Sequence, residues 1–445
     1  MAATETTLSK KKPFLIGSLI ALLTIFSLAS FFIQLGNIKK NDSTAVYGVD
    51  LIAYYTAAQL IEKGEISDIY SEIKDDFSVV NSGKFFETAK RSGFQGIPTR
   101  YVYLPLFLAP LKLLTKFSFC TAANLWLILN LICVITVVSL EWYFTKNLPY
   151  PFIRLMFITS LNLCSFPLFY ALKLGQTSII VYLVVCFIYL FTIKNRDLIG
   201  GIFLGVIITL KFSPLLFALY FLYRKRYTLI ISCILTVVTI FLTSIITYGL
   251  PIHKIYWDYL CGLSNLGIAA WSNQSLDAFL LRLFTKSSFL HFSPIKVTTF
   301  FSLVKYAITL SVIGMLYLSL RGKPKVNQQR SYPLEFSAIT LCLLITPSIS
   351  WLHYFTLVTL STILIINFYF PIRSYQAWIV IPFIGISYAM ISFHPDQASL
   401  IALLGQGLFT KFLISFPFFG TCLIFIINLS LMRIHQTTTL NSYTL

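Results

Sequence analysis

Long apolar runs constrain this chain more than any other feature of its sequence. Runs of about 17 to 25 apolar residues recur along nearly its whole length, each long enough to cross about 30 Å of hydrocarbon as a helix. Hydrophobic residues make up 57% of the 445 residues and charged residues only 11%. A soluble fold needs more polar side chains than this to cover its surface, so that class is excluded. We predict an all-α polytopic membrane protein with roughly 11 to 13 transmembrane helices.

The predicted spans form a single integral membrane domain with one long polar segment. The first span, 13–35, follows three lysines but lacks a small-residue cleavage site, so we interpret it as a membrane helix and not as a signal peptide. Residues 36–100 form a large outward loop, residues 101–432 hold the remaining helices, and residues 433–445 form a polar tail. Further spans are predicted at 101–117, 119–144, 152–171, 176–193, 228–250, 297–320, 334–351, 353–371, 376–392 and 412–432.

The positive charge is distributed as in a membrane protein and not as in a nucleic-acid-binding protein. Of the 34 Lys and Arg residues, eight lie in 36–100, together with nine of the 16 Asp and Glu residues. The rest of the chain is strongly basic, and its cations are scattered through short loops between apolar runs. Cationic loops of this kind stay in the cytoplasm and fix the orientation of the protein. We therefore expect a multi-pass protein of the plasma membrane whose loop 36–100 faces the periplasm or exterior, with no nucleic-acid partner.

The stretch 197–226 has cationic residues at both ends but apolar residues for only one crossing. A single crossing would place one cationic group on the wrong side of the membrane. Two short helices, 198–210 and 214–223, would instead form a re-entrant hairpin, which is tolerated where it lines protein or a wet cavity. Lys211 would then lie at the turn, inside a membrane-embedded site, where a substrate anion is a suitable partner. A tilted single span with a snorkelling lysine is the alternative.

A lone carboxylate, Asp50, precedes a helical apolar pattern in the outward loop. Tyr54 and Tyr55 lie on one face of this pattern and Gly64 ends it, so Asp50 occupies the position of an N-cap. A purely capping role is one interpretation. A carboxylate held by backbone N–H groups and the helix dipole also stays ionised, so it can accept a hydrogen bond from a substrate hydroxyl.

Other polar residues lie at the edges of predicted spans. His353 lies at a turn between two apolar runs, where a solvated or hydrogen-bonded loop histidine is equally compatible with the sequence. Candidate ligands for sugar hydroxyls or an anion, each explained equally well by helix capping, are Lys173, Gln176, Asn273, Gln274 and Arg282. A P-loop, a dinucleotide-binding glycine motif, a nucleophile elbow and a His/Cys cluster with metal-ligand spacing are all missing from the sequence. We expect no metal and no other cofactor.

Six motifs follow one another between about residues 48 and 360: "GVDLIAYYTAAQLIEKGEISDIY", "RYVYLPLFLAPLKLL", "LGQTSIIVYLVV", "LKFSPLLFALYFLYRKR", "NQSLDAFLLRLF" and "TPSISWLHYF". This ordered set resembles glycosyltransferase family 87, which contains polyprenyl-phosphate-mannose-dependent α-mannosyltransferases of the membrane-embedded C-type glycosyltransferase fold. The resemblance implies a hexosyltransferase, with mannose as the expected sugar. It also implies a polyprenyl-phosphate-linked sugar donor, a lipid or glycan acceptor and contact with membrane lipids.

The resemblance also implies roles for individual residues. Asp50 matches the position of the family's catalytic base in the first outward loop, and His353 matches the histidine that assists at the same site. The motifs add three tyrosines as substrate-binding candidates, namely Tyr54, Tyr55 and Tyr103. Leu104 replaces a usual proline and Tyr354 a frequent second histidine, so the sugar and the acceptor stay open.

The chemistry expected of such an enzyme needs a base and a cation. Asp50 would take the proton of the acceptor hydroxyl while this oxygen attacks the anomeric carbon from the face opposite the phosphate, which inverts that centre. The leaving phosphate gains charge, and Lys211 is the first candidate to stabilise it, with Lys173 and Arg282 in reserve.

Three other functions are compatible with a polytopic chain. A transporter or lipid flippase commonly has two related halves. The sequence shows no internal repeat, which argues against this class. A polysaccharide polymerase or ligase would share the outward loop and the lipid-linked substrate, but we expect more arginines there than Arg91 and Arg100. A membrane scaffold would leave the intramembrane charge of Lys211 unexplained.

Overall fold

Helices dominate the computed structural model of the protein. The model describes residues 2–40, 47–70, 76, 78–211, 213–264, 266–285, 289–321, 328–369, 375–392 and 397–441. The one sheet within these ranges pairs two two-residue strands in antiparallel orientation, β1 (Leu266–Gly267) and β2 (Ile295–Lys296). The predicted all-α polytopic class is confirmed.

Five helices in the described part of the chain are long and apolar enough to cross a membrane. They are α1 (Ala2–Lys40), α5 (Phe119–Phe144), α11 (Tyr227–Tyr248), α14 (Thr299–Arg321) and α20 (Phe416–Asn441). Shorter apolar helices complete the bundle, namely α8 (Ser178–Ile193), α9 (Asp197–Leu210), α15 (Gln328–Ile345), α16 (Leu357–Tyr369) and α17 (Tyr375–Ser392). A helix of 14 residues such as α9 is only about 21 Å long, shorter than the hydrocarbon core. The number of crossings therefore stays a prediction.

The predicted span 152–171 is a broken helix. The structure divides it into α6 (Pro151–Leu163) and α7 (Phe166–Leu174), which are bent by 56°. Pro167 lies in the first turn of α7, where a missing N–H is tolerated, and Ser165 before it is extended. Counted as one span, this pair brings the membrane-crossing candidates among the described residues to six.

The predicted span 101–117 is wrong. These residues form three short pieces, which are η2 (Pro105–Phe107), α4 (Leu108–Leu111) and η3 (Leu114–Lys116). Pro105 and Pro110 explain the difference, because proline removes a backbone donor and its ring clashes with the preceding turn. The short pieces pack with α2 (Val49–Glu62) in one apolar cluster that includes Leu104 and Leu108.

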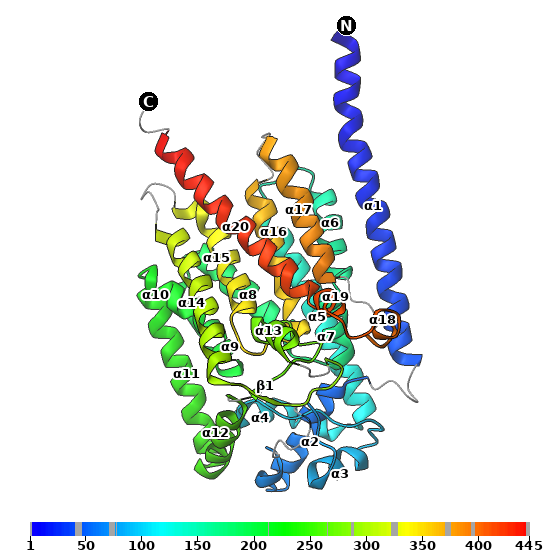
Figure 1. Ribbon diagram of the computed structural model, residues 1–445, viewed down its shortest axis with the longest axis vertical. Coiled ribbons are helices and arrows are strands. Elements are labelled where there is room, and N and C mark those ends of the chain that lie inside the picture. The colour runs from blue at the N-terminus through cyan, green and yellow to red at the C-terminus, as the bar shows by residue number, and fades with distance from the viewer. Residues whose placement is uncertain are drawn as a thin grey trace.

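These pieces belong to a cap at one end of the bundle. In Figure 1 α2, α3 (Gly83–Arg91) and α12 (Leu250–Ser264) lie at the lower end, opposite the N-terminus of α1. Burial of Leu51, Leu60 and Tyr101 against the end of the bundle holds the cap in place. The cap therefore places the start of α2 next to the membrane helices.

Gly175 makes this junction possible. Its φ of 70° ends α7 in the left-handed region, and a Cβ added there would lie 2.8 Å from the Cβ of Leu51. Only glycine allows the end of α7 to approach the start of α2 so closely. The indole N–H of Trp126 donates to the Gly175 carbonyl at 2.8 Å, and the Gly48 N–H donates to the Lys173 carbonyl at 3.1 Å.

The predicted hairpin is present. α9 and α10 (Leu215–Tyr223) are separated by a break at Lys211, and Phe212 lies outside the described residues. Arg226, just after α10, forms an ion pair of 2.5 Å with Asp197, the first residue of α9. The chain therefore enters and leaves the hairpin at the same end, which contradicts the single tilted span.

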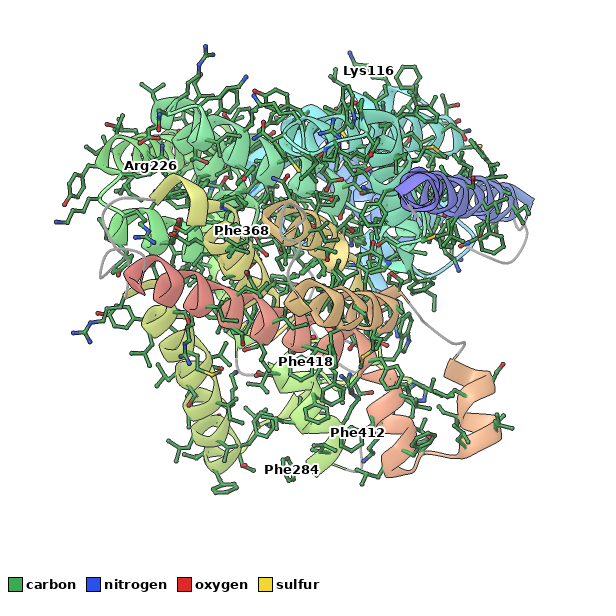
Figure 2. The ribbon with its side chains drawn as sticks, turned by 90° about the horizontal axis from the view of Figure 1, so that it is seen from above. Lys116, Arg226, Phe284, Phe368, Phe412 and Phe418 are labelled. Atoms are coloured by element: carbon green, nitrogen blue, oxygen red, sulfur yellow. The ribbon has the colours of Figure 1, made fainter. Side chains whose placement is uncertain are left out.

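The surface of the bundle is apolar where lipid would contact it. Phe284, at the end of α13 (Leu276–Phe284), is 73% exposed, and Phe412, in α19 (Leu408–Ile414), is 38% exposed. Both lie at the same edge of the molecule when it is viewed from above (Figure 2). Exposed aromatic and aliphatic side chains over a whole edge are expected of a protein whose solvent is hydrocarbon.

Candidate functional site

Asp50 lies in the first turn of α2 and is not its N-cap, which corrects the predicted position. The N-cap is Gly48, whose φ of 76° is left-handed, and no side chain caps the helix. The carboxylate of Asp50 is therefore not occupied by capping the backbone. The positive end of the helix dipole still favours a negative charge at this position.

Two neutral donors hold the carboxylate. The amide of Gln176 donates to Asp50 Oδ2, and Thr99 also hydrogen-bonds to the Asp50 side chain. Tyr54 donates its hydroxyl to Gln176 Oε1 at 3.0 Å, so Gln176 is fixed from both sides. These contacts orient the carboxylate without pairing it to a cation.

Burial sets the protonation of Asp50. Its side chain is 8% exposed, and burial raises the pKa from 3.8 to about 6. The hydrogen bonds from Thr99 and Gln176 and the positive charge of Lys211 act in the opposite direction. A carboxylate whose pKa lies this close to neutrality is suited to general-base catalysis, because it is ionised at pH 7 and still basic.

His353 faces the same space from the other side of the bundle's end. It lies in η4 (Leu352–Thr356), is 4% exposed, and its two ring nitrogens have no hydrogen-bond partner among the described residues. By contrast, both ring nitrogens of His253 are bonded, to Ser244 and to the carbonyl of Gly249. An unsatisfied buried polar group costs about 1–3 kcal/mol, so the His353 ring is a candidate to bind a ligand in this space.

A cavity of about 260 Å³ joins these residues. Five of the predicted site residues line it, namely Asp50, Tyr54, Tyr103, Gln176 and His353. Aromatic rings from Tyr170, Phe292 and Trp351 form much of the remaining wall. The volume is below the roughly 300–1,000 Å³ of pockets for drug-sized ligands, so the cavity suits a single ring with polar groups.

Lys211 lies next to this cavity but does not line it. Its Nζ is 3.3 Å from the ring centroid of Tyr354, a close cation–π contact. Tyr354 lines both the main cavity and a second one of about 20 Å³ that includes Lys211. The ring of Tyr354 therefore lies between the lysine and the main cavity.

Two predicted ligands lie elsewhere on the cap and α7. Tyr55 is the neighbour of Tyr54, but its hydroxyl donates to the Phe117 carbonyl at 2.7 Å, on another side of α2. Lys173 is exposed and does not line the cavity. Tyr55 and Lys173 are close in sequence to the cavity residues Tyr54 and Gln176. The direction of each side chain, however, follows from the packing of α2 and α7.

Three further predicted ligands donate their side-chain hydrogen bonds to backbone carbonyls. Arg282 is fully buried and donates to the carbonyls of Ala270 and Asn273 at 3.0 and 2.9 Å. Asn273 donates to the Ile268 carbonyl at 3.0 Å, and Gln274 donates to the Ile414 carbonyl at 2.8 Å. The structure does not bring these side chains into the cavity, so capping-type contacts account for them.

Several further residues form the cavity wall. Thr99, Arg100, Tyr170 and Trp351 line it but were not predicted. Among the described Lys and Arg residues, only Arg100 lines the main cavity. Its Nη2 donates a hydrogen bond to the Asp76 carbonyl at 3.0 Å. Arg100 stands at the start of the motif "RYVYLPLF", and this position could have identified it as a site residue from the sequence. Within the described ranges no three His, Cys, Asp or Glu residues are grouped closely enough to hold a metal ion.

Comparison with known proteins identifies one family. The model of glycosyltransferase family 87 matches residues 101–352, which is more than half of the chain. No curated protein and no solved structure matches the chain. The matched range includes Tyr103, Gln176 and Lys211. Asp50 lies before this range, and His353 is the first residue after it.

Proposed function

The chain belongs to glycosyltransferase family 87 and is a membrane glycosyltransferase, and on this premise we propose that it transfers a hexose from a polyprenyl-phosphate-linked donor. The acceptor is the hydroxyl of a lipid or glycan on the outer face of the plasma membrane. One observation carries the proposal. Asp50, a buried carboxylate with a pKa of about 6, and His353, whose imidazole has no hydrogen-bond partner among the described residues, line one cavity of sugar-ring size.

Asp50 acts as the general base in this proposal. It accepts the proton of the acceptor hydroxyl while the acceptor oxygen forms its bond to the anomeric carbon. The bond from that carbon to the phosphate oxygen breaks, and the lipid phosphate leaves with the electron pair. One displacement inverts the anomeric centre, so a β-linked donor gives an α-linked product. His353 holds a substrate hydroxyl through a ring nitrogen that no described residue hydrogen-bonds.

Arg100 takes the role of phosphate ligand in this proposal. Its place in the cavity wall supports this, since the leaving phosphate gains charge and a guanidinium can bind two phosphate oxygens at once. Lys211, the first candidate from the sequence, is separated from the main cavity by the ring of Tyr354. We assign Lys211 the role of keeping Asp50 ionised, because its charge lowers the pKa of that carboxyl.

The position of the cavity supports a lipid-linked donor. The cavity walls come from the cap and from helices of the bundle, so a sugar held there lies where a membrane lipid exposes its headgroup. Aromatic rings suit the apolar face of a pyranose, and the carboxylate, amide and imidazole suit its hydroxyl groups. Mannose is the sugar we expect to be transferred.

The test is transfer of radiolabelled mannose from polyprenyl-phosphate mannose to a total lipid extract in proteoliposomes. The wild-type protein is run beside Asp50→Asn and beside Glu62→Gln, an exposed carboxylate of the same helix as a matched control. We expect transfer by the wild type and by Glu62→Gln, and a loss of about 10²–10⁴-fold in Asp50→Asn.

Two outcomes would change the proposal. Equal transfer by Asp50→Asn would remove the base assignment and leave the family assignment in place. Failure of the wild type with mannose and then with glucose and other polyprenyl-linked hexoses would refute the lipid-phosphate donor.

A further inference from the structure

A buried ion pair joins a membrane helix to the region of the cavity. Lys305 lies in α14, and its Nζ is 2.7 Å from Asp277 Oδ2 in α13. Its side chain is 14% exposed and that of Asp277 4%. A buried charge in apolar surroundings is costly even when paired, so its presence in a membrane helix calls for a specific role.

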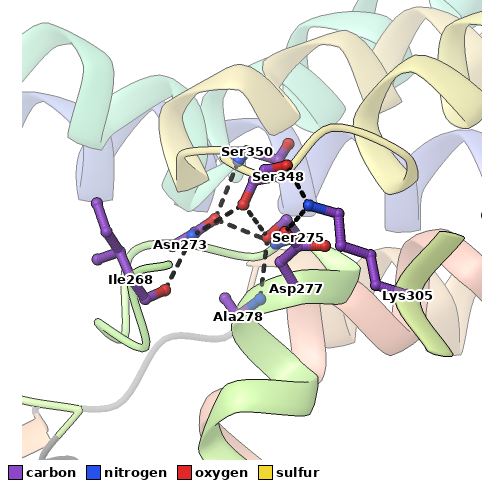
Figure 3. Close-up of polar contacts among 8 residues, drawn as sticks. All are labelled: Ile268, Asn273, Ser275, Asp277, Ala278, Lys305, Ser348 and Ser350. Atoms are coloured by element: carbon purple, nitrogen blue, oxygen red, sulfur yellow. Dashed lines mark hydrogen bonds and ion pairs between the residues drawn. The ribbon is translucent and has the colours of Figure 1, made fainter. Parts of the chain in front are cut away.

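The same lysine also reaches the loop 346–351, which connects α15 to η4. Lys305 Nζ is 2.8 Å from the hydroxyl of Ser348, and the hydroxyl of Ser275 donates to the Ser348 carbonyl at 2.8 Å (Figure 3). The side-chain carbonyl of Asn273 accepts the N–H of Ser350 at 2.9 Å. Three different segments therefore meet at this loop through side chains.

Backbone hydrogen bonds fix the rest of the loop against the segment before α13. The N–H of Gln274 donates to the Ser350 carbonyl at 2.7 Å, and the N–H of Leu352 donates to the Ser272 carbonyl at 2.7 Å. Asn273 and Trp351 form an isolated antiparallel bridge. The chain thus arrives at Trp351 with its direction set by extended pairing to its neighbour.

This loop decides where two cavity residues lie. Trp351 and His353 follow Ser348 by three and five residues, and both line the main cavity. Because the His353 ring has no hydrogen bond of its own among the described residues, its place depends on the backbone that carries it.

We infer that Lys305, Asp277 and Ser348 are positioning residues that hold Trp351 and His353 in the cavity. The inference rests on the proposed function for its effect on catalysis, but not for its effect on the place of His353. The ion pair fixes α14 to α13, and the bond to Ser348 fixes both helices to the loop. Loss of this junction removes the contact of Lys305 with the loop, while the bond from Ser275 to the Ser348 carbonyl and the backbone bonds at Ser350 and Leu352 remain.

The test measures the accessibility of His353 as well as activity. Diethyl pyrocarbonate acylates neutral imidazole, and mass spectrometry gives the rate at His353 relative to exposed His291. In Lys305→Met we expect this ratio to rise about threefold, because local opening exposes the buried ring. Transfer is expected to fall about tenfold in kcat, with a smaller change in the KM for the donor, because a displaced group loses productive geometry.

Two controls separate positioning from a general loss of stability. Lys305→Arg keeps the charge and should restore both the labelling ratio and transfer toward wild-type values. Arg226→Met breaks a comparable ion pair, between Arg226 and Asp197, that lies away from the loop. The side chains of this pair are 18% and 21% exposed. We expect this variant to leave the labelling ratio of His353 unchanged.

Each outcome decides the inference. An unchanged labelling ratio and unchanged kcat in folded Lys305→Met would show that the ion pair only stabilises the fold. If Lys305→Met does not fold, Ser348→Ala decides, because it removes the bond to the loop and keeps the ion pair. If the wild type transfers no sugar, the proposed function fails while the labelling ratio still tests the junction.

Discussion

Two buried clusters of charged residues lie at opposite ends of the helical bundle and differ in how completely the protein satisfies them. Glu335, near the start of α15, accepts hydrogen bonds from Tyr220 at 2.8 Å, Arg224 Nε at 2.7 Å and Ser331 at 2.7 Å, so both carboxylate oxygens are bonded. At the cavity, Asp50 has no bonded cation and His353 has no hydrogen-bond partner in the described part of the chain. The first arrangement satisfies its charges within the fold, and the second leaves the polar groups that the proposed function assigns to a substrate.

The comparison predicts opposite results for the two carboxylates, and this is the largest effect we expect. Asp50→Asn should lose transfer by about 10²–10⁴-fold and yet unfold at the same or a higher temperature. The reason is that burial penalises the charged form of Asp50, so a neutral amide of the same shape removes that cost. Initial transfer rates and thermal unfolding in detergent measure the two effects. A fall in both quantities would mean that Asp50 stabilises the fold.

Glu335→Gln is the converse experiment. Removing the charge leaves the partly exposed Arg224 beside a neutral amide, so we expect a cost below that of a fully buried pair, which is about 3–5 kcal/mol. We expect a clear fall in the unfolding temperature, with transfer per folded molecule within about twofold of the wild type. Thermal unfolding and active-fraction measurements test this. A selective loss of transfer would connect this cluster to the cavity and break the comparison.

Arg100→Gln tests the proposed phosphate ligand. We expect a loss of about ten- to a hundredfold in kcat/KM for the lipid-linked donor, because a charge-assisted bond to phosphate is worth about 1.5–3 kcal/mol. Arg100→Lys should recover part of the loss, since lysine keeps the charge but not the planar geometry. Arg91→Gln, an exposed arginine paired with Glu87, is the control. Equal kinetics for Arg100→Gln and Arg91→Gln would return the phosphate to Lys211.

The pH dependence of transfer follows from the raised pKa of Asp50. Because the base must be ionised, activity should fall as the pH decreases through about 6 and should be about tenfold lower at pH 5 than at its plateau. The stability of the fold changes with pH in the opposite direction to the rate of transfer. The folded carboxyl binds a proton more tightly than the unfolded one, so its contribution to stability decreases as the pH rises from about 4 to about 6. A rate profile flat from pH 5 to 8 would contradict this assignment.

Two neighbouring tyrosines give the smallest and most selective comparison. Tyr54→Phe removes the bond that fixes Gln176 against Asp50, and we expect transfer to fall about three- to tenfold. Tyr55→Phe removes a bond to the Phe117 carbonyl away from the cavity and should leave transfer within about twofold. Parallel rate measurements on the two variants decide whether the direction of the side chains matters. Equal rates would show that the Tyr54 hydroxyl has no part in orienting the base.

Part of the site was predictable from local features of the sequence. Asp50 is a lone carboxylate before an apolar helix, and His353 lies at a turn between apolar runs, so both were identifiable without a structure. The break at Lys211 was predictable because charges at both ends of 197–226 disfavour a single crossing. The site residues Arg100, Tyr170 and Trp351 were missed because arginines and aromatic residues at span edges are common in any membrane protein.

Local patterns alone establish that this chain is a bundle of membrane helices with a polar cap, since apolar runs of spanning length are stable only in lipid. The predicted spans 101–117 and 152–171 took no account of Pro105, Pro110 and Pro167, near which the structure interrupts the helices. Which polar side chains share a cavity depends on the packing of distant segments. Gln176 lies 126 residues from Asp50 and bonds to it because Gly175 lets α7 approach α2, whereas Asn273, Gln274 and Arg282 turn toward the backbone. Helix formation follows from local patterns, but the direction of a polar side chain follows from contacts between segments far apart in the chain.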